Sequence, residues 1–218
     1  MSREGAEARR REMVAAQIEA RGVADARVLA AMRTVPREEF VAAGWHDRAF
    51  DDNPLPIAAG QTISQPYIVA FMAEALQLRG DERVLEVGSG SGYAAAVLGR
   101  LAREVHTVEC IAELADAAAT KLAAQGAHNV QVHRGDGSLG WPAAAPYDAI
   151  VVTAVGPAVP VALTAQLGDG GRLVMPVGAR EGRQQLLRLT RERDGTLRRE
   201  SLMDVRFVPL TGAQGWPG

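Results

Sequence analysis

The chain has 218 residues and a mass of 23.1 kDa, which fits one domain that can bury a sizeable core. Hydrophobic residues make up 47% and charged residues 23%, values that exclude intrinsic disorder, a collagen-like repeat and a coiled coil. With 24 basic against 26 acidic residues, the formal net charge is -2, so no global positive field exists to hold a nucleic acid backbone.

The compartment is indicated by the cysteine content and by the N-terminal residues. Cys110 is the single cysteine, so an internal disulfide is impossible and a reducing compartment fits best. Residues 1–17 are polar and charged, and no stretch approaches the ~20 apolar residues that span a bilayer. We therefore expect a cytoplasmic monomer that binds neither membrane nor nucleic acid.

Helices and a long loop are predicted for the first part of the chain. One helix ends near Gly22, a favoured C-cap residue, and Asp25 caps a second helix that Pro36 stops. Residues 44–64 are interrupted by proline and glycine and predict an irregular loop, which at that length is usually functional. Residues 65–78 predict a strongly apolar helix.

Strands and helices then alternate. Strands are expected at residues 83–87, 105–109, 129–133, 148–153 and 172–177, and helices at 93–102, 111–125 and 159–167. This alternation is typical of a parallel sheet with right-handed crossovers. Two extended runs, 184–192 and 196–208, meet at Asp194-Gly195, so we expect a final antiparallel hairpin.

A glycine-rich loop follows the first of these strands. Gly88, Gly90 and Gly92 let the backbone turn tightly and approach a ligand at the start of a helix. Glu109 ends the next strand, 21 residues beyond Gly88, where its carboxylate can accept hydrogen bonds from two ribose hydroxyls. Together they predict an adenosine-containing ligand at the carboxyl ends of the strands.

Two residues favour S-adenosylmethionine over a dinucleotide. Tyr93 stands where a dinucleotide fold needs a third glycine, and Glu86 would repel a pyrophosphate but suits a sulfonium and an amino group. The alternatives are that Glu86 caps the helix start, and that the chain is a nicotinamide-dependent oxidoreductase. Asp136, before Gly137, either reaches the adenine amino group or forms an ordinary turn.

Four segments resemble the protein-L-isoaspartate O-methyltransferase family: GQTISQPYIVAFM at 60–72, RVLEVGSGSGYAAAVL at 83–98, GDGSLGW at 135–141 and VRFVPLTG at 205–212. The resemblance implies an α/β fold with the Rossmann-like sheet of S-adenosylmethionine-dependent methyltransferases, mostly parallel, with N-terminal helices and a C-terminal hairpin. It implies a single domain over 1–218, with a helical cap and substrate loop at 1–80, a cofactor-binding core at 81–180 and a substrate-side segment at 181–218.

The resemblance also implies an activity. The enzyme would methylate the free α-carboxylate of L-isoaspartyl residues in damaged proteins, with S-adenosyl-L-methionine as donor, S-adenosyl-L-homocysteine as product and no metal. The methyl ester would then close to a succinimide, whose hydrolysis restores part of the aspartate. Two alternatives remain open: methylation of aspartate in one dedicated partner peptide, and a binding module that senses the cofactor without turnover.

The family's functional residues fall on positions of this chain that match its motifs. Ser64 corresponds to the active-site serine, although its spacing alone favours a helix cap. The cofactor motifs fall on Glu86, Gly88, Ser89, Gly90, Gly92, Glu109, Cys110, Asp136 and Gly137. The substrate segments fall on Thr62, Ile63, Val208, Pro209 and Leu210.

The implied chemistry needs few side chains. A carboxylate nucleophile, with a pKa of about 3.3–3.7, is ionised at neutral pH and requires no general base. The four histidines are scattered along the sequence, and we expect all of them to be structural or exposed. The arginine-rich stretch 180–199 is interpreted as a solvated hairpin face in preference to a landing surface for acidic peptides.

Overall fold

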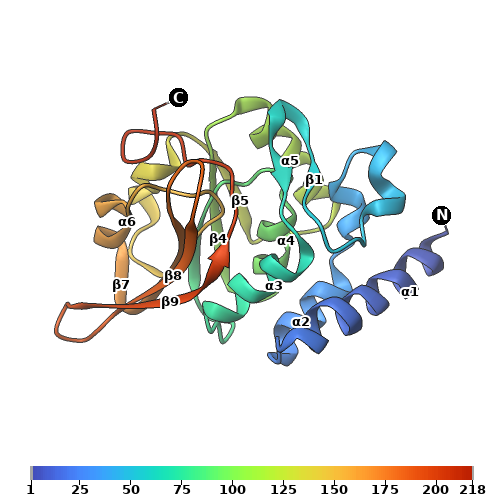
Figure 1. Cartoon of the computed structure of the whole chain (residues 1–218), viewed down its shortest axis with the longest axis horizontal. Coiled ribbons are helices and arrows are strands. Elements are labelled where there is room, and N and C mark those ends of the chain that lie inside the picture. Colours follow the sequence, from blue (N-terminus) through green and yellow to red (C-terminus); the bar gives the residue numbers. More distant parts are fainter. Residues whose placement is uncertain (1, 218) are drawn as a thin grey trace.

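The computed structural model describes residues 2–217 and has a seven-stranded sheet with helices packed against it (Figure 1). The strands in chain order are β1 (Leu55–Pro56), β2 (Thr62–Ile63), β3 (Arg83–Val87), β4 (Glu104–Glu109), β5 (Val130–Arg134), β6 (Tyr147–Val152), β7 (Leu167–Gly178), β8 (Gln184–Arg191) and β9 (Leu197–Val205). The α-helices are α1 (Arg3–Met13), α2 (Ala26–Thr34), α3 (Pro66–Ala75), α4 (Tyr93–Gly99), α5 (Ala112–Ala124) and α6 (Val161–Ala165).

The strand order of the large sheet is β5-β4-β3-β6-β7-β8-β9. Strands β3 to β7 are parallel to one another. Strand β8 pairs antiparallel with β7 and β9 antiparallel with β8, so the sheet ends in an antiparallel hairpin, as the sequence predicts. The chain runs outward from β3 to β5 and then returns to the other side of β3 with β6. Strand β3 therefore marks the point where the strand order reverses, and ligands of open α/β sheets bind at the carboxyl ends there.

Strand β3 is apolar along most of its length because both faces of the sheet are covered. Val84 belongs to the buried cluster that includes the N-terminal helices, α3 and α4, whereas Leu85 and Val87 belong to the cluster under α6. A strand buried on both faces loses the apolar–polar alternation of a half-exposed strand. This explains why the neighbouring Val84 and Leu85 are both apolar although they lie on opposite faces of the sheet.

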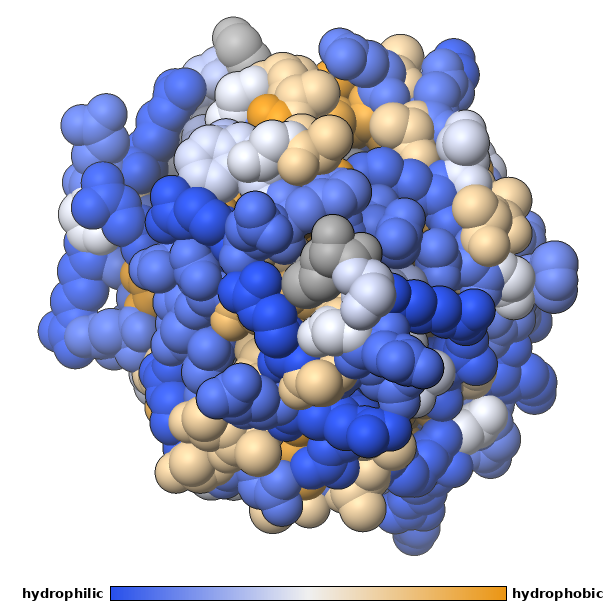
Figure 2. Space-filling view, turned by 90° about the vertical axis from the view of Figure 1, so that its right-hand side faces the viewer, coloured by the Kyte–Doolittle hydropathy of each residue, from blue (hydrophilic) through white to orange (hydrophobic). Residues whose placement is uncertain are grey.

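The N-terminal helices form one end of the molecule, away from the tip of the β8–β9 hairpin (Figure 1). Helix α1 continues through a π turn and a 3-10 turn to Gly22, whose φ of 98° ends it, and the Asp25 carboxylate accepts the N–H groups of Arg27 and Val28. Both sequence predictions are confirmed. Figure 2 shows that the outer face of this end is mostly hydrophilic, with small separated apolar groups.

Four predicted elements differ from the structure. The helix predicted at 93–102 ends at Gly99, as α4. Helix α3 ends at Ala75, well short of residue 78, because the chain turns into β3 through Gln77 at a positive φ of 53°. The predicted 159–167 helix is limited to α6, since Leu167 already pairs with Tyr147 as part of β7. The predicted irregular loop at 44–64 contains short 3-10 turns and the β1–β2 pair.

The hairpin arginines are mostly partnered. Arg188 lies 2.9 Å from Glu200, and Arg198 contacts both Glu192 and Glu200 at 2.9 and 2.8 Å. Exposed pairs of this kind are weak individually but leave little net charge on the ribbon. The interpretation of a solvated hairpin face agrees with these contacts. Among residues 2–217, no helix is long and apolar enough to cross a membrane.

Candidate active site

A cavity of about 700 Å³ opens at the carboxyl ends of the central strands, where the strand order reverses. Its volume lies within the usual range for small-molecule sites. Twelve residues expected at the site from the sequence line it: Thr62, Ile63, Ser64, Gly88, Ser89, Gly90, Glu109, Cys110, Gly137, Val208, Pro209 and Leu210. Segments far apart in sequence therefore meet around one hollow.

The glycine loop is fixed at the end of β3 by close backbone contacts. The Gly88 N–H donates to the carbonyl of Val108 at 2.8 Å, and the Thr153 hydroxyl donates to the Gly88 carbonyl at 2.8 Å. Gly88 has φ 94°, and a Cβ on it would lie 2.5 Å from the Thr153 hydroxyl oxygen. Only glycine combines this conformation with so close a neighbour.

Glu109 joins the glycine loop to the end of β4. Its carboxylate accepts the N–H groups of Gly90 at 2.9 Å and of Ile111 at 3.0 Å, and the residue is only 5% exposed. A carboxylate offers about four lone-pair sites, and the Cys110 thiol contacts a third one at 3.7 Å. One open acceptor site, and a second held only by this weak thiol contact, are therefore left for ligand hydroxyls.

Two further residues that the sequence predicted at the cofactor site are Cys110 and Gly137. Cys110 is exposed, and its Sγ lies 3.6 Å from the hydroxyl oxygen of Thr211 in the C-terminal segment. Gly137 is buried where the β5 end meets β3 and β4, and a Cβ on it would lie 2.5 Å from a methyl carbon of Val87. Both residues line the cavity.

Glu86 does not line the cavity and does not cap the helix start. It is fully buried beneath the glycine loop, where it accepts a hydrogen bond from Thr107 at 2.5 Å, and Thr107 in turn contacts Ser89 at 2.7 Å. Its Oε1 has no partner, and burial raises the pKa of the carboxyl to about 8. The structure therefore does not place Glu86 where it could contact a ligand in the cavity, and only Ser89 of the Glu86–Thr107–Ser89 series lines it. The N-cap of α4 is Gly92.

Gly92 and Asp136 also lie outside the cavity lining. Gly92 has φ 88° and packs against Ala118 of α5, so it positions the helix behind the loop. The Asp136 carboxylate accepts hydrogen bonds from Ser138 and from the Ala213 N–H at 2.7 Å. Burial raises its pKa, but these hydrogen bonds outweigh burial and hold the pKa below its usual value. In this structure Asp136 caps a turn and anchors the C-terminal segment, as the ordinary-turn alternative has it.

Ser64 also lines the cavity. The N-cap of α3 is Gln65, without a side-chain capping bond, so the cap alternative for Ser64 is wrong. Within residues 2–217 its hydroxyl makes no hydrogen bond, although the residue is half-buried. A hydroxyl that the fold does not use is available to a ligand.

The substrate segments are held by backbone pairing. Thr62 and Ile63 form β2, opposite Pro56 and Leu55 of β1. The segment from Val208 to Leu210 exchanges hydrogen bonds with both backbone groups of Val155, each at 2.8 Å. This pairing brings the C-terminal segment against the end of β6 and beside Ser64.

Several lining residues were not anticipated from the sequence. They share positions beside predicted motifs or at strand ends, and they include Ser91, Ile111, Thr153, Arg180, Arg206, Phe207 and Thr211. Ser91, Ile111 and Thr153 had a usable signal, since the carboxyl ends of neighbouring parallel strands share one edge of the sheet. Arg180 begins the stretch for which a landing surface was the less favoured alternative, and Arg206 lies in the VRFVPLTG segment. Their approach to the cavity was not predictable, because it depends on how β7 and β9 end.

None of the four histidines lies among the residues of the cavity. The buried His106 ring contacts Glu104 and His133, each at 2.9 Å, and His133 stacks on Trp141 with ring centroids 4.0 Å apart. Both rings pack on strands of the sheet. In the part of the chain that the structure describes, His, Cys, Asp and Glu form no group that could hold a metal ion.

This sheet, with a glycine loop after β3, an acidic residue ending β4 and an antiparallel C-terminal hairpin, has the Rossmann-like fold of the S-adenosylmethionine-dependent methyltransferases. A family model described as protein-L-isoaspartate(D-aspartate) O-methyltransferase matches residues 8–215. The chain therefore belongs to this family.

Curated relatives agree over nearly the whole chain. A protein-L-isoaspartate O-methyltransferase of Rhodopseudomonas palustris is 65% identical over 204 residues, covering 94% of both chains. A second, from Pelobacter propionicus, is 57% identical and covers 96% of this chain and 93% of its own.

Solved structures agree as well. A protein-L-isoaspartate O-methyltransferase structure matches with a TM-score of 0.85 and 31% identity, over 94% of this chain and 67% of that one. A Plasmodium falciparum structure of that kind, in complex with S-adenosyl-L-homocysteine, has a TM-score of 0.79 and 22% identity, over 93% and 98% of the two chains. The second likeness concerns the fold alone.

Proposed function

We propose that this enzyme transfers a methyl group from S-adenosyl-L-methionine to the free α-carboxylate of L-isoaspartyl residues in damaged proteins and peptides. The observation that carries the proposal is the meeting of Ser64 with the glycine loop around one cavity. A hydroxyl without a partner and a loop suited to adenosine line the same hollow. Family membership supplies the substrate class.

The residues around the cavity fit the cofactor. The remaining acceptor sites of Glu109 suit the two ribose hydroxyls, and the backbone of Gly88 to Ser91 lets a ligand come close. Gly137 and Cys110 flank the place where an adenine ring would lie, and Asp136 would hold that wall. Glu86, whose Oε1 lacks a partner, would support Ser89 from below.

The chain's own residues then have a positioning task. When bound, S-adenosylmethionine supplies a methyl group on a sulfonium, which a carboxylate can attack directly. Ser64 would donate a hydrogen bond to the substrate carboxylate and orient one oxygen, and no base is needed because the carboxylate is already ionised. Thr62 and Ile63 on one side, and the segment from Val208 to Leu210 on the other, would hold the peptide and keep water out.

The product chemistry accounts for repair. The methyl ester carbonyl is a better electrophile than a carboxylate and can release methanol. The neighbouring backbone nitrogen therefore attacks this carbonyl carbon, loses its proton and closes to a succinimide as methanol leaves, without further help from the enzyme. Hydrolysis of the succinimide then returns part of the material to normal aspartate. The partners of this chain would accordingly be aged proteins and peptides that carry isoaspartate, in the cytoplasm.

The test uses two synthetic peptides that differ only in aspartate against isoaspartate at one position. Incubation with radiolabelled S-adenosylmethionine should give base-labile methyl ester on the isoaspartyl peptide alone. Methylation of the aspartyl peptide alone would overturn the proposal in favour of a dedicated aspartyl substrate. Binding of S-adenosylmethionine without methylation of either peptide would point to a sensing module.

A further inference from the structure

Three arginines line the cavity, and they differ in their partners. Arg21 is paired with Asp52 at 2.7 Å and stacks on the Tyr67 ring at 3.6 Å. Arg180 and Arg206 are exposed, and their side chains make no hydrogen bond, ion pair or ring contact with any of residues 2–217. Two guanidinium groups therefore reach the cavity without a partner in the part of the chain that the structure describes.

The carboxylates of the same cavity do not fully neutralise them. Asp204 lies 3.5 Å from Arg183, which balances its charge. Glu109 keeps its negative charge while it accepts the N–H groups of Gly90 and Ile111, so it offsets only one of the two unpaired arginines. The net charge at this opening is consequently positive. This local excess contrasts with the net charge of -2 for the whole chain.

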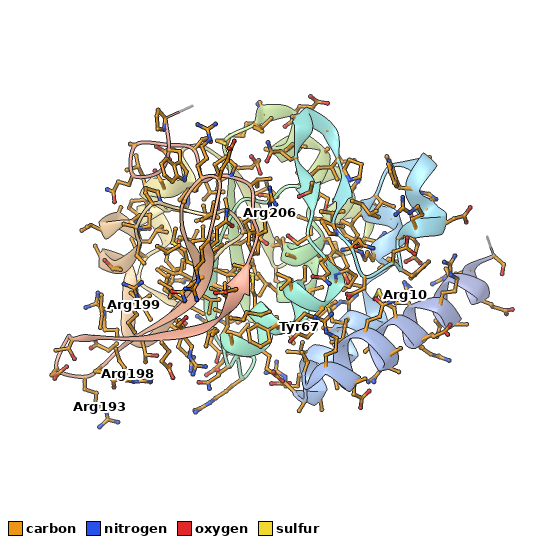
Figure 3. All side chains as sticks on the ribbon, in the orientation of Figure 1. Arg10, Tyr67, Arg193, Arg198, Arg199 and Arg206 are labelled. Carbon is orange, nitrogen blue, oxygen red and sulfur yellow. The ribbon has the colours of Figure 1, made fainter. Side chains whose placement is uncertain are left out.

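The two arginines come from different elements and flank the substrate side of the cavity. Arg180 follows β7, and Arg206 follows β9, two residues before Val208. Figure 3 shows Arg206 between the end of the β8–β9 hairpin and the segment that carries β1, whereas Arg193 and Arg199 extend from the far part of the hairpin. A peptide entering toward Ser64 would pass between these elements.

We infer that Arg180 and Arg206 form a cationic rim that binds acidic side chains flanking the isoaspartyl residue, and so make the enzyme favour acidic peptides. The inference rests on the proposed function and names a substrate preference within it. A guanidinium presents a fork of donors that matches a carboxylate, and here no internal ion pair has to be broken first. The rim also attracts the anionic substrate before it docks.

The test compares two isoaspartyl peptides whose flanking residues are both glutamate or both glutamine. Wild-type enzyme should have about two- to fivefold higher kcat/KM on the glutamate peptide at low salt, the range expected for exposed ion pairs. The double variant R180Q/R206Q should lose this preference. The matched control R193Q/R199Q removes the same charge from the hairpin and should retain it.

Ionic strength gives a second measurement that needs no variant. Salt screens the interaction between exposed charges. The ratio of the wild-type kcat/KM on the glutamate peptide to that on the glutamine peptide should therefore fall toward one as the salt concentration is raised. Three results would overturn the inference. The ratio of kcat/KM for the glutamate peptide to that for the glutamine peptide could equal one at low salt, could be unchanged in R180Q/R206Q, or could fall equally in both double variants. Failure of the proposed function looks different, because the glutamine peptide would then not be methylated by wild-type enzyme at all.

Discussion

We expect the hydroxyl of Ser64 to contribute to catalysis but very little to the stability of the folded chain. Its hydroxyl has no hydrogen-bond partner within the described residues, and the N-cap of α3 is Gln65. Removing the hydroxyl therefore breaks no bond of the folded chain. Any effect of the change must arise with the ligands bound.

We expect Ser64→Ala to lower kcat/KM for an isoaspartyl peptide by about ten- to a hundredfold. A hydrogen bond to a charged group is worth about 1.5–3 kcal/mol, which corresponds to that range. The melting temperature should match that of Ser201→Ala, a control on the exposed face of β9. Unchanged kinetics with a lowered melting temperature would leave Ser64 a structural role only.

Glu86 carries a prediction on the pH dependence of stability. Burial raises the pKa of its carboxyl from 4.5 to about 8, so the folded chain keeps a proton that the unfolded chain releases. The stabilisation is fully present below pH 4.5 and is lost as pH rises toward about 8. Glu86→Gln removes this titration, and its unfolding free energy should change less with pH across that window.

Chemical denaturation of both proteins from pH 5 to 8 measures the difference. The wild type should lose stability relative to Glu86→Gln as pH rises. Glu113→Gln, on the exposed side of α5, serves as the control for removal of one carboxyl. Parallel curves for wild type and Glu86→Gln would contradict the raised pKa.

At the scale of elements, the glycine loop depends on backbone conformation more than on side chains. Gly88 and Gly170 both have positive φ, at 94° and 71°, but only Gly88 has a close neighbour. An alanine at either position is strained by about 1–3 kcal/mol. At position 88 its Cβ would in addition meet the Thr153 hydroxyl at 2.5 Å.

We therefore expect Gly88→Ala to weaken binding of S-adenosyl-L-homocysteine at least tenfold, because the loop must shift to relieve the contact. Gly170→Ala should lower the melting temperature but leave this affinity unchanged. Isothermal titration calorimetry on both variants measures the affinities. Equal affinities for wild type and Gly88→Ala would mean that the loop does not approach the cofactor.

Element types were predictable from the sequence where a local pattern determines them. The apolar run of β3 and the Asp194-Gly195 turn indicated a buried strand and a hairpin, and both are present. The ends of α3 and α6 were not predictable, because the start of β7 and the turn at Gln77 depend on contacts with other elements. Two-residue strands such as β1 are too short for any period to reveal.

The residues of the candidate site also differ in whether a local sequence pattern predicts them. Gly88 and Glu109 were recognisable because the loop and the next strand end carry their own pattern. The anchoring of Asp136 was not, since its partner Ala213 lies 77 residues away, and neither was the position of Glu86 beneath the glycine loop. Long-range pairing of side chains with backbone groups leaves no local signal in a single sequence.

At the scale of the whole molecule, the cavity is a meeting point of the sheet, the β1–β2 segment and the C-terminal segment. The parallel sheet predicts where a ligand lies, but not what covers it. The residues that cover it come from the β1–β2 segment, which precedes the core strands in the sequence, and from the C-terminal segment, which follows them. A bound ligand should therefore stabilise the fold, because it would contact all three parts at once.

Thermal unfolding with and without ligand tests this coupling. A ligand that binds only the folded state at a hundred times its Kd adds about 2.7 kcal/mol of stability. For a chain of this size that corresponds to an increase in melting temperature of about 5–11 °C. S-adenosyl-L-homocysteine should produce this increase, and a nicotinamide dinucleotide at the same concentration should not, because Tyr93 stands where a dinucleotide fold needs glycine. A tenfold weaker Gly88→Ala variant should show about half of this increase or less at the same ligand concentration. An equal increase with the dinucleotide would instead support the oxidoreductase alternative.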